Sequence, residues 1–158
     1  MTEPSNHEQF MAIAIKLAKQ AEEIGEVPIG ALIVDENDEI IAEGFNCPIN
    51  EHDPSAHAEI IAIRRAAKKI ENYRTKPNLR LYVTLEPCTM CAGAISFARI
   101  EHVIFGAYDK KGGAIVNGAR FFDSENCHFR PKITHGILEN ECSTVLKDFF
   151  AKKRRQKG

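Results

Sequence analysis

Hydrophobic residues in the first part of the chain follow a helical pattern and then two strand patterns. From 6 to 24 they recur at i, i+3, i+4 and i+7, the spacing of a helix with one buried stripe, and Gly25 can end it. The runs 29–34 (IGALIV) and 39–45 (EIIAEGF) are separated by DEND and therefore predict a β-hairpin. Because both runs are nearly all apolar, we expect these strands to be covered on both faces.

Helical patterns then alternate with apolar strands. After a polar, proline-containing loop, the sequence predicts a helix over 56–70 with Ser55 as its N-cap, and a buried strand over 79–86 (LRLYVTLE). Pro87 suits the first turn of a helix, so we expect a third helix from 88 to about 98.

The last third of the chain contains two more strands and a final helix. A strand over 102–108 (HVIFGAY) leads into a glycine-containing loop over 109–114 and an irregular stretch over 115–131 with at most a short helical turn. A short strand over 131–137 and a helix over 139–153 follow.

This order of elements predicts the fold class. The series α, β, β, α, β, α, β, β, α implies a three-layer α/β/α sandwich around a mixed five-stranded sheet, in which an antiparallel hairpin adjoins strands that helices connect in parallel. With 158 residues the chain can bury a sizeable core, so we predict a single domain over 1–158. Apolar residues make up 44% and charged residues 27%, near globular averages, which argues against disorder or a small disulfide framework.

Charge is distributed unevenly along the chain. The net charge of −1 does not by itself indicate a nucleic-acid-binding protein. Five of the 21 basic residues, however, lie within 152–158, which leaves about −6 on the rest of the chain. This basic C-terminal tail is a candidate local basic patch.

The N-terminus and the cysteine count indicate a cellular compartment. MTEPSNHEQF is acidic and polar where a secretory signal is basic and then apolar, and no run of roughly 18 apolar residues could span a membrane. We therefore expect a cytoplasmic protein with no membrane partner. In that reducing compartment, an odd number of cysteines, five, indicates metal binding, catalysis or burial in preference to disulfides.

Four residues carry the candidate chemistry. His57 and Glu59 begin the second predicted helix, while Cys88 and Cys91 begin the third, so both helix N-termini can meet above one edge of the sheet. Two thiolates three positions apart and one imidazole suit tetrahedral zinc and leave one position for water, which is the pattern of a catalytic site. Glu59 can then carry a proton between water and substrate.

Other interpretations of these residues stay open from spacing alone. A Cys-x-x-Cys pair can be a redox pair or pack a helix, and a structural zinc site needs a fourth protein ligand. The candidates for that ligand are Cys47, His52, Cys127 and His128. An RNA-binding module that uses zinc only to join two helices would fit the same residues.

The sequence is also similar to a known family. HAE (57–59) followed by PCTMC (87–91) resembles the signature of the zinc-dependent nucleobase deaminases. The longer runs resemble the bacterial tRNA-specific adenosine deaminases over nearly the whole chain. Those runs are EVPIGALIV (26–34), HDPSAHAEIIAIR (52–64), LYVTLEPCTMCAGAI (81–95), GAYDKKGGA (106–114) and ILENECSTVLKDFFAKKRR (137–155).

That resemblance implies a cytidine-deaminase-like fold and a specific reaction. The implied activity is hydrolytic conversion of adenosine to inosine at the wobble position of a tRNA anticodon stem-loop, by a homodimer with one Zn²⁺ per subunit. His57, Cys88 and Cys91 would hold the metal, and Glu59 would shuttle protons. Relatives of this type that deaminate free cytidine, deoxycytidylate or guanine share HAE and PCxxC, so a free-base or nucleotide substrate is the alternative.

The resemblance also implies residues that contact the substrate. A base that reacts must leave its stack, so a splayed loop nucleotide is the expected target. Asn46 would bond the base edge, Ile29 would pack on the ring, and Pro48 and Ala58 would shape the pocket. On sequence alone, Asn46 could equally satisfy its own loop backbone.

Two further regions are implied to contact RNA. Asp109 is similar to a position near the sugar-phosphate backbone, although the neighbouring Tyr108 departs from the arginine frequent in some relatives. In the tail, Phe149 would stack on a base or shape the pocket, while Lys153 and Arg154 would contact phosphates. Basic residues also favour any helix C-terminus, and we expect one of the two adjacent phenylalanines to belong to the core.

Overall fold

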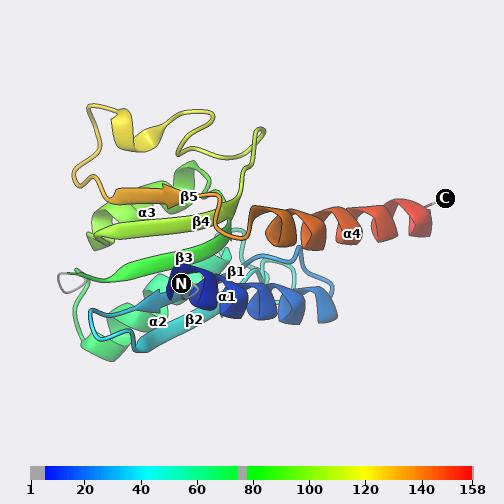
Figure 1. Cartoon of the computed structure of the whole chain (residues 1–158), viewed down its shortest axis with the longest axis horizontal. Helices are drawn as coiled ribbons and strands as arrows, with labels where there is room; N and C mark the ends of the chain where they lie inside the picture. The colour runs from blue at the N-terminus through cyan, green and yellow to red at the C-terminus, as the bar shows by residue number, and fades with distance from the viewer. Residues whose placement is uncertain (1–5, 75–77, 158) are drawn as a thin grey trace, which may run out of the picture.

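A computed structural model describes residues 6–74 and 78–157, without the side chain of Lys157 (Figure 1). The helices are α1 (Asn6–Glu23), α2 (Ala58–Ile70), α3 (Thr89–Ala98) and α4 (Glu139–Lys157), with a 3₁₀ turn η1 (Phe121–Asp123). The strands are β1 (Gly30–Val34), β2 (Ile40–Phe45), β3 (Arg80–Leu85), β4 (His102–Ala107) and β5 (Lys132–His135). Each element predicted from the hydrophobic pattern is present, and α4 continues four residues further than expected.

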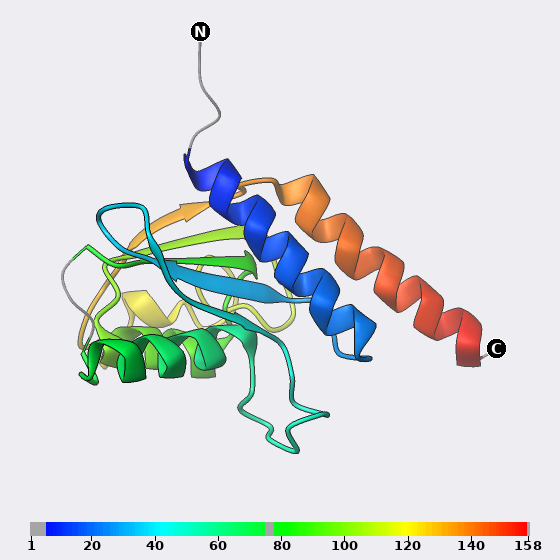
Figure 2. The same cartoon turned by 90° about the horizontal axis from the view of Figure 1, so that it is seen from below.

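The five strands form one mixed sheet in the order β2-β1-β3-β4-β5. β1 pairs antiparallel with β2 and with β3, whereas β3, β4 and β5 run parallel. Figure 2 shows α1 and α4 side by side over one face of this sheet and α2 and α3 over the other. The predicted three-layer α/β/α sandwich is therefore confirmed.

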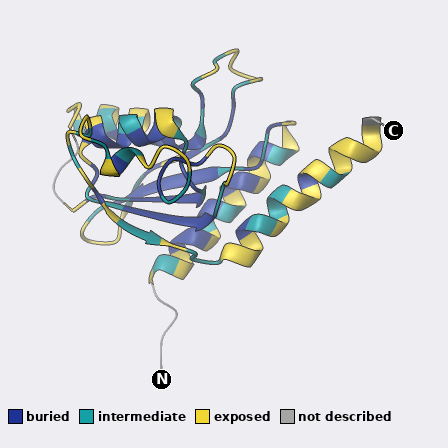
Figure 3. Ribbon diagram, turned by 90° about the horizontal axis from the view of Figure 1, so that it is seen from above, coloured by how far each residue is buried: buried dark blue, intermediate teal, exposed yellow. Residues whose placement is uncertain are grey.

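Two apolar clusters fill the layers on either side of the sheet (Figure 3). Alternate residues of β1 serve the two clusters: Ala31 and Ile33 pack toward α2 and α3, and Leu32 and Val34 toward α1. All five β1 residues are buried, as predicted. The same prediction for β2 is wrong, because β2 is an edge strand and Glu43 is exposed to solvent.

A glycine in β2 brings the start of α2 close to the sheet. A Cβ atom at Gly44 would lie 2.7 Å from the Ala58 carbonyl oxygen and 2.9 Å from the Ala62 nitrogen, so only glycine permits this approach. The close packing fixes the N-terminus of α2, and with it the position of His57.

Across 6–74 and 78–157, no helix combines the length and the apolar character that a bilayer crossing requires.

Candidate metal centre

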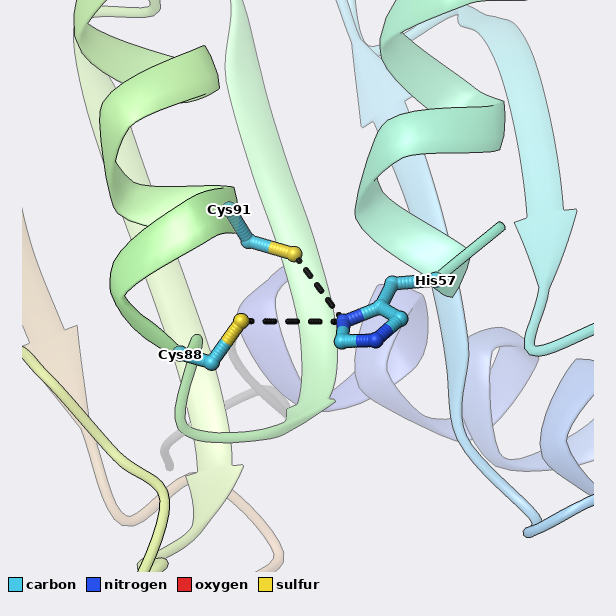
Figure 4. Close-up of side chains that lie close together, drawn as sticks. All are labelled: His57, Cys88 and Cys91. Carbon is cyan, nitrogen blue, oxygen red and sulfur yellow. Dashed lines mark hydrogen bonds between the residues drawn. The ribbon is translucent and has the colours of Figure 1, made fainter. Parts of the chain in front are cut away.

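Three side chains meet where α2 and α3 begin. His57 is the N-cap residue of α2, Cys88 is the N-cap residue of α3, and Cys91 lies in the first turn of α3. The His57 Nδ1 atom is 3.6 Å from the Cys88 sulfur and 3.4 Å from the Cys91 sulfur (Figure 4). The prediction that these three residues converge is confirmed.

The two N-cap positions explain how the ligands are presented. Neither His57 nor Cys88 makes a side-chain capping bond to its own helix, and the two side chains point toward each other in the space between the helices (Figure 4). The prediction of Ser55 as the N-cap of α2 is wrong: its hydroxyl donates to the Asp53 carboxylate at 2.7 Å, within the preceding turn. Pro87 precedes the α3 cap instead of occupying the first turn.

The spacing fits a tetrahedral zinc ion. With Zn–S near 2.3 Å and Zn–N near 2.05 Å, a tetrahedral arrangement separates sulfur from nitrogen by about 3.6 Å, close to both observed distances. Among the residues the structure describes, this is the one group of three or more His, Cys, Asp or Glu side chains that could hold a metal ion. Neither Cys47, His52, Cys127 nor His128 joins it, so the described ligand set has three members.

The three ligand atoms also influence one another's protonation. A hydrogen bond from the Cys91 thiol, together with the nearby His57 ring, lowers the pKa of Cys88 to about 4 although burial opposes this. The hydrogen bond to Cys88 and then burial raise the pKa of Cys91, while the bond to Cys88 raises that of His57. The contacts within the group therefore favour the thiolate form of Cys88, and a bound cation would compete with protons for all three ligand atoms.

Glu59 lies beside this group but is not part of it. It is 4% exposed, and burial raises the pKa of its carboxyl to about 7. The His57 ring and the Cys91 thiol are among the groups that act against this rise, so the carboxyl lies close to the ligand group. A buried carboxyl next to a ligand, outside the ligand set, suits a group that accepts and returns protons.

Comparison with known proteins gives the family of this arrangement. Residues 4–107 match the profile of the cytidine and deoxycytidylate deaminase zinc-binding region. A tRNA-specific adenosine deaminase of Haemophilus influenzae is 51% identical over 150 residues, covering 95% of this chain and 86% of the relative. One of Agrobacterium fabrum is 47% identical, covering 92% of this chain and 94% of the relative.

This chain belongs to the tRNA-specific adenosine deaminase family. A solved structure described under A-to-I editing by tRNA:A34 deaminases at the wobble position of transfer RNA superposes with a TM-score of 0.85. It shares 46% sequence identity and covers 87% of this chain and 99% of its own. The deaminase fold and the zinc requirement expected from the sequence are confirmed.

In this deaminase, one side of the metal centre is formed by a loop that runs beside His57. The Asn46 backbone N–H donates to the Ile29 carbonyl at 2.9 Å, and the Cys47 N–H donates to the Ala56 carbonyl at 2.9 Å. These two bonds join the segment 46–47 to Ile29, just before β1, and to Ala56, just before His57. Asn46 is buried and Ile29 is half-buried.

Pro48 and Ala58, also predicted to shape the pocket, differ in exposure. Pro48 is half-buried in the same loop as Asn46. Ala58 is fully buried in the first turn of α2, against Gly44. The base contacts of all four pocket residues remain predictions.

Asp109 lies two residues after the end of β4, in the loop that leads to η1. Its Oδ1 atom accepts hydrogen bonds from the backbone N–H groups of Lys111 at 3.2 Å and Gly112 at 2.9 Å. One carboxylate oxygen of Asp109 therefore closes its own loop. The predicted contact of Asp109 with RNA is not tested by this geometry.

The tail continues α4 beyond the sandwich (Figures 1 and 2). Phe149 is buried, and together with Lys153 it lines a hollow formed with the last turn of α1. The Lys153 ammonium lies over the Phe149 ring, 5.5 Å from its centroid. Phe150 is 43% exposed, so Phe149 is the core member of the pair, while Lys153 and Arg154 face solvent.

Sequence reasoning missed two buried carboxylates that hold the flanking loops. Glu26 accepts bonds from the Ile49 N–H at 3.3 Å, and from the Asn50 N–H and side-chain amide at 2.8 and 2.7 Å. Burial alone would raise the pKa of Glu26, but those hydrogen bonds together lower it below its usual value.

Glu86 is buried in the same manner at the end of β3. Burial opposes its ionisation, yet hydrogen bonds from Asn117, Asp109 and Val116 outweigh that effect and lower the pKa of its carboxyl. The available signal was a charged residue ending an apolar strand immediately before Pro87 and Cys88.

Proposed function

We propose that this protein converts adenosine to inosine at the wobble position of a tRNA anticodon. The observation that carries the proposal is the convergence of His57, Cys88 and Cys91 beside the buried Glu59, in a chain that shares about half its residues with tRNA-specific adenosine deaminases. Water adds its oxygen to C6 of adenine, the bond from C6 to the exocyclic nitrogen breaks, and ammonia leaves.

Each site residue has a role in that reaction. A zinc ion held by the three ligands supplies the Lewis acid that makes water nucleophilic near neutral pH. Glu59 takes a proton from the attacking water and gives it to the ring nitrogen beside C6, and then carries the second proton to the departing ammonia. Burial of this carboxyl near the ligand set supports that role.

The hydrogen-bonded segment 46–47, which lies between Ile29 and the residue before His57, supports a base pocket. We infer that the Asn46 side chain bonds the adenine edge, that Ile29 packs on the ring, and that Pro48 and Ala58 limit the space around it. Asn46 already has its backbone N–H satisfied by Ile29, which favours a role for its side chain other than closing its own loop.

RNA contacts extend from the pocket to the tail. Lys153 and Arg154 are exposed on α4 and suit phosphate oxygens, and Asp109 suits a ribose 2′-hydroxyl. Phe149 fits the predicted role of shaping this surface, since it supports the Lys153 side chain from below. Because the proposed substrate is tRNA, we infer a cytoplasmic enzyme.

A homodimer is the expected assembly of this single domain, residues 1–158. Tyr73 and Phe97 are 73% and 68% exposed and line one hollow on the α2–α3 side of the molecule. Exposed aromatic side chains of this size are typical of a surface that a partner covers. Sedimentation of the zinc-loaded protein, with Phe97→Asp as the variant, tests this assembly.

The experiment that tests the function is incubation of zinc-loaded enzyme with host tRNA, followed by mapping of inosine in the anticodon. We expect inosine at the wobble position of at least one tRNA. Absence of inosine in every tRNA, together with ammonia release from free cytidine, deoxycytidylate or guanine, would instead favour the free-base or nucleotide alternative. The same assay with heat-unfolded tRNA measures how much the stem-loop shape contributes.

A further inference from the structure

Glu86, the residue that follows β3, has a buried carboxylate surrounded by donors from one loop. It is 2% exposed and accepts five hydrogen bonds. Its Oε1 atom accepts from the Asp109 N–H (3.1 Å) and the Asn117 side-chain amide (2.7 Å). Its Oε2 atom accepts from the N–H groups of Ile115 (3.1 Å), Val116 (2.8 Å) and Asn117 (3.0 Å).

The loop is also shaped to admit this carboxylate. A Cβ atom at Gly113 would lie 2.5 Å from the Glu86 carboxyl carbon and 2.7 Å from its Oε1 atom, so the missing side chain leaves the space that the carboxylate fills. The Ala114 N–H donates to the Pro87 carbonyl at 2.9 Å, directly before Cys88. Residues 109–117 therefore curl around Glu86 and contact the segment that carries a metal ligand.

The hydrogen bond from the Asp109 N–H to the Glu86 carboxylate suggests a role for Glu86 beyond stability. Hydrogen bonds fix Asp109 at its backbone and at its side chain. Its N–H donates to Glu86, and its Oδ1 atom accepts from the N–H groups of Lys111 and Gly112. A change at Glu86 would move the Asp109 backbone while leaving His57, Cys88 and Cys91 with their mutual contacts, since none of those contacts involves Glu86.

We propose that Glu86 is a positioning residue that orders the 109–117 loop and so sets the orientation of Asp109 toward the RNA substrate. The proposal rests on the function proposed above. It assigns Glu86 to substrate binding and leaves the ligand set and Glu59 to the chemical step.

The main test is Glu86→Gln. Glutamine offers one acceptor oxygen, so it keeps at most the three bonds at Oε2 and turns an N–H₂ group toward the other two donors. We expect KM for an anticodon stem-loop RNA to rise about tenfold while kcat changes less than about threefold and zinc stays at one ion per chain. Glu101→Gln is the matched control: Glu101 accepts from the Asn78 N–H at the opposite end of the sheet, and this variant should keep the parental KM.

Coupling to Asp109 separates positioning from a general loss of stability. If Glu86 acts through Asp109, then Glu86→Gln in an Asp109→Asn background raises KM by much less than it does in the parent. Adding Asn117→Asp to Glu86→Gln gives the new amide an acceptor and should restore part of the KM. A KM increase of the same factor in both backgrounds, with no rescue by Asn117→Asp, would overturn the proposal.

A milder variant keeps the test available should Glu86→Gln not fold. Asn117→Ala removes one of the five donors, and we expect KM to rise about two- to threefold; an unchanged KM would count against the proposal. The two proposals fail differently. If the parent enzyme forms inosine and both variants keep its KM, only the role of Glu86 is refuted, whereas a parent that forms no inosine refutes both.

Discussion

The two ends of the five-stranded sheet both hold partly buried titratable side chains, but in different surroundings. Where β3 and β4 begin, the His7 ring is hydrogen-bonded to the Tyr82 hydroxyl at 2.7 Å, and the His102 ring to the Thr134 hydroxyl at 2.7 Å. Where β3 ends and α2 and α3 start, His57 faces two sulfur atoms at 3.4 and 3.6 Å.

The difference shows what distinguishes a candidate site from a satisfied polar cluster. At the starting end, burial and nearby positive charges lower the pKa values of both histidines, and hydroxyl groups satisfy the neutral rings. At the other end, an imidazole and two sulfur atoms surround one point, and the contacts with Cys91 and His57 lower the pKa of Cys88. Burial alone therefore does not mark chemistry, whereas convergence of different donor types on one point does.

Removal of the metal should have the largest effect. We expect Cys88→Ser to bind less than a tenth of the zinc, to lose measurable deamination, and to melt at a lower temperature than the parent, because the ligands then no longer share a cation. Metal content by mass spectrometry and inosine formation measure this. Cys127→Ser is the control, since Cys127 is outside the ligand group, and it should keep both zinc and activity.

Loss of the proton carrier should come next. Glu59→Ala should retain one zinc per chain and lose about 10²- to 10⁴-fold in kcat, because it removes general acid-base catalysis and leaves the ligands in place. Glu59→Gln, which keeps the shape of the side chain, should lose as much. An active Glu59→Ala enzyme would contradict the assigned mechanism.

The tail should matter for RNA and not for chemistry. Deleting 152–158, of which Gly158 and the side chain of Lys157 lie outside the described residues, should lower kcat/KM on tRNA about tenfold or more and weaken its salt dependence. Activity on a free nucleoside should change little. Equal losses on both substrates would argue that the tail supports folding only.

The smallest effect should come from the opposite end of the sheet. Burial, followed by the charges of His7, Lys132 and Arg80, lowers the pKa of His102 to about 4. The unfolded chain, with a histidine pKa near 6.5, then binds more protons than the folded one between these values. The stability from neutral His102 is therefore complete above pH 6.5 and is lost as pH falls toward 4.

Denaturant unfolding at pH 7 and pH 5 measures that loss. His102 is only half-buried, so solvent screening reduces the effect to about 1 kcal/mol. His102→Gln should unfold with less dependence on pH over this range and keep the parental activity at pH 7. A pH dependence equal to that of the parent would show that other groups cause it.

Local patterns in the sequence indicated the elements and the sandwich, and two short motifs supplied the candidate ligands, while spacing alone left a fourth ligand open. Periodicity of 3.6 or 2 residues reflects which side of an element is buried, and HAE and PCTMC each place their ligands within a few positions at a helix start. These are short-range properties, so no tertiary contact is needed to detect them.

Only the tertiary structure decided which positions receive partners from far along the chain. The exposure of β2 depends on its place at the sheet edge, and Phe149 instead of Phe150 is buried because α4 packs against α1. Glu86 meets donors 23 to 31 residues away. Such contacts form only when distant parts of the chain come together, and the periodicity of hydrophobic residues does not indicate which distant residues will meet.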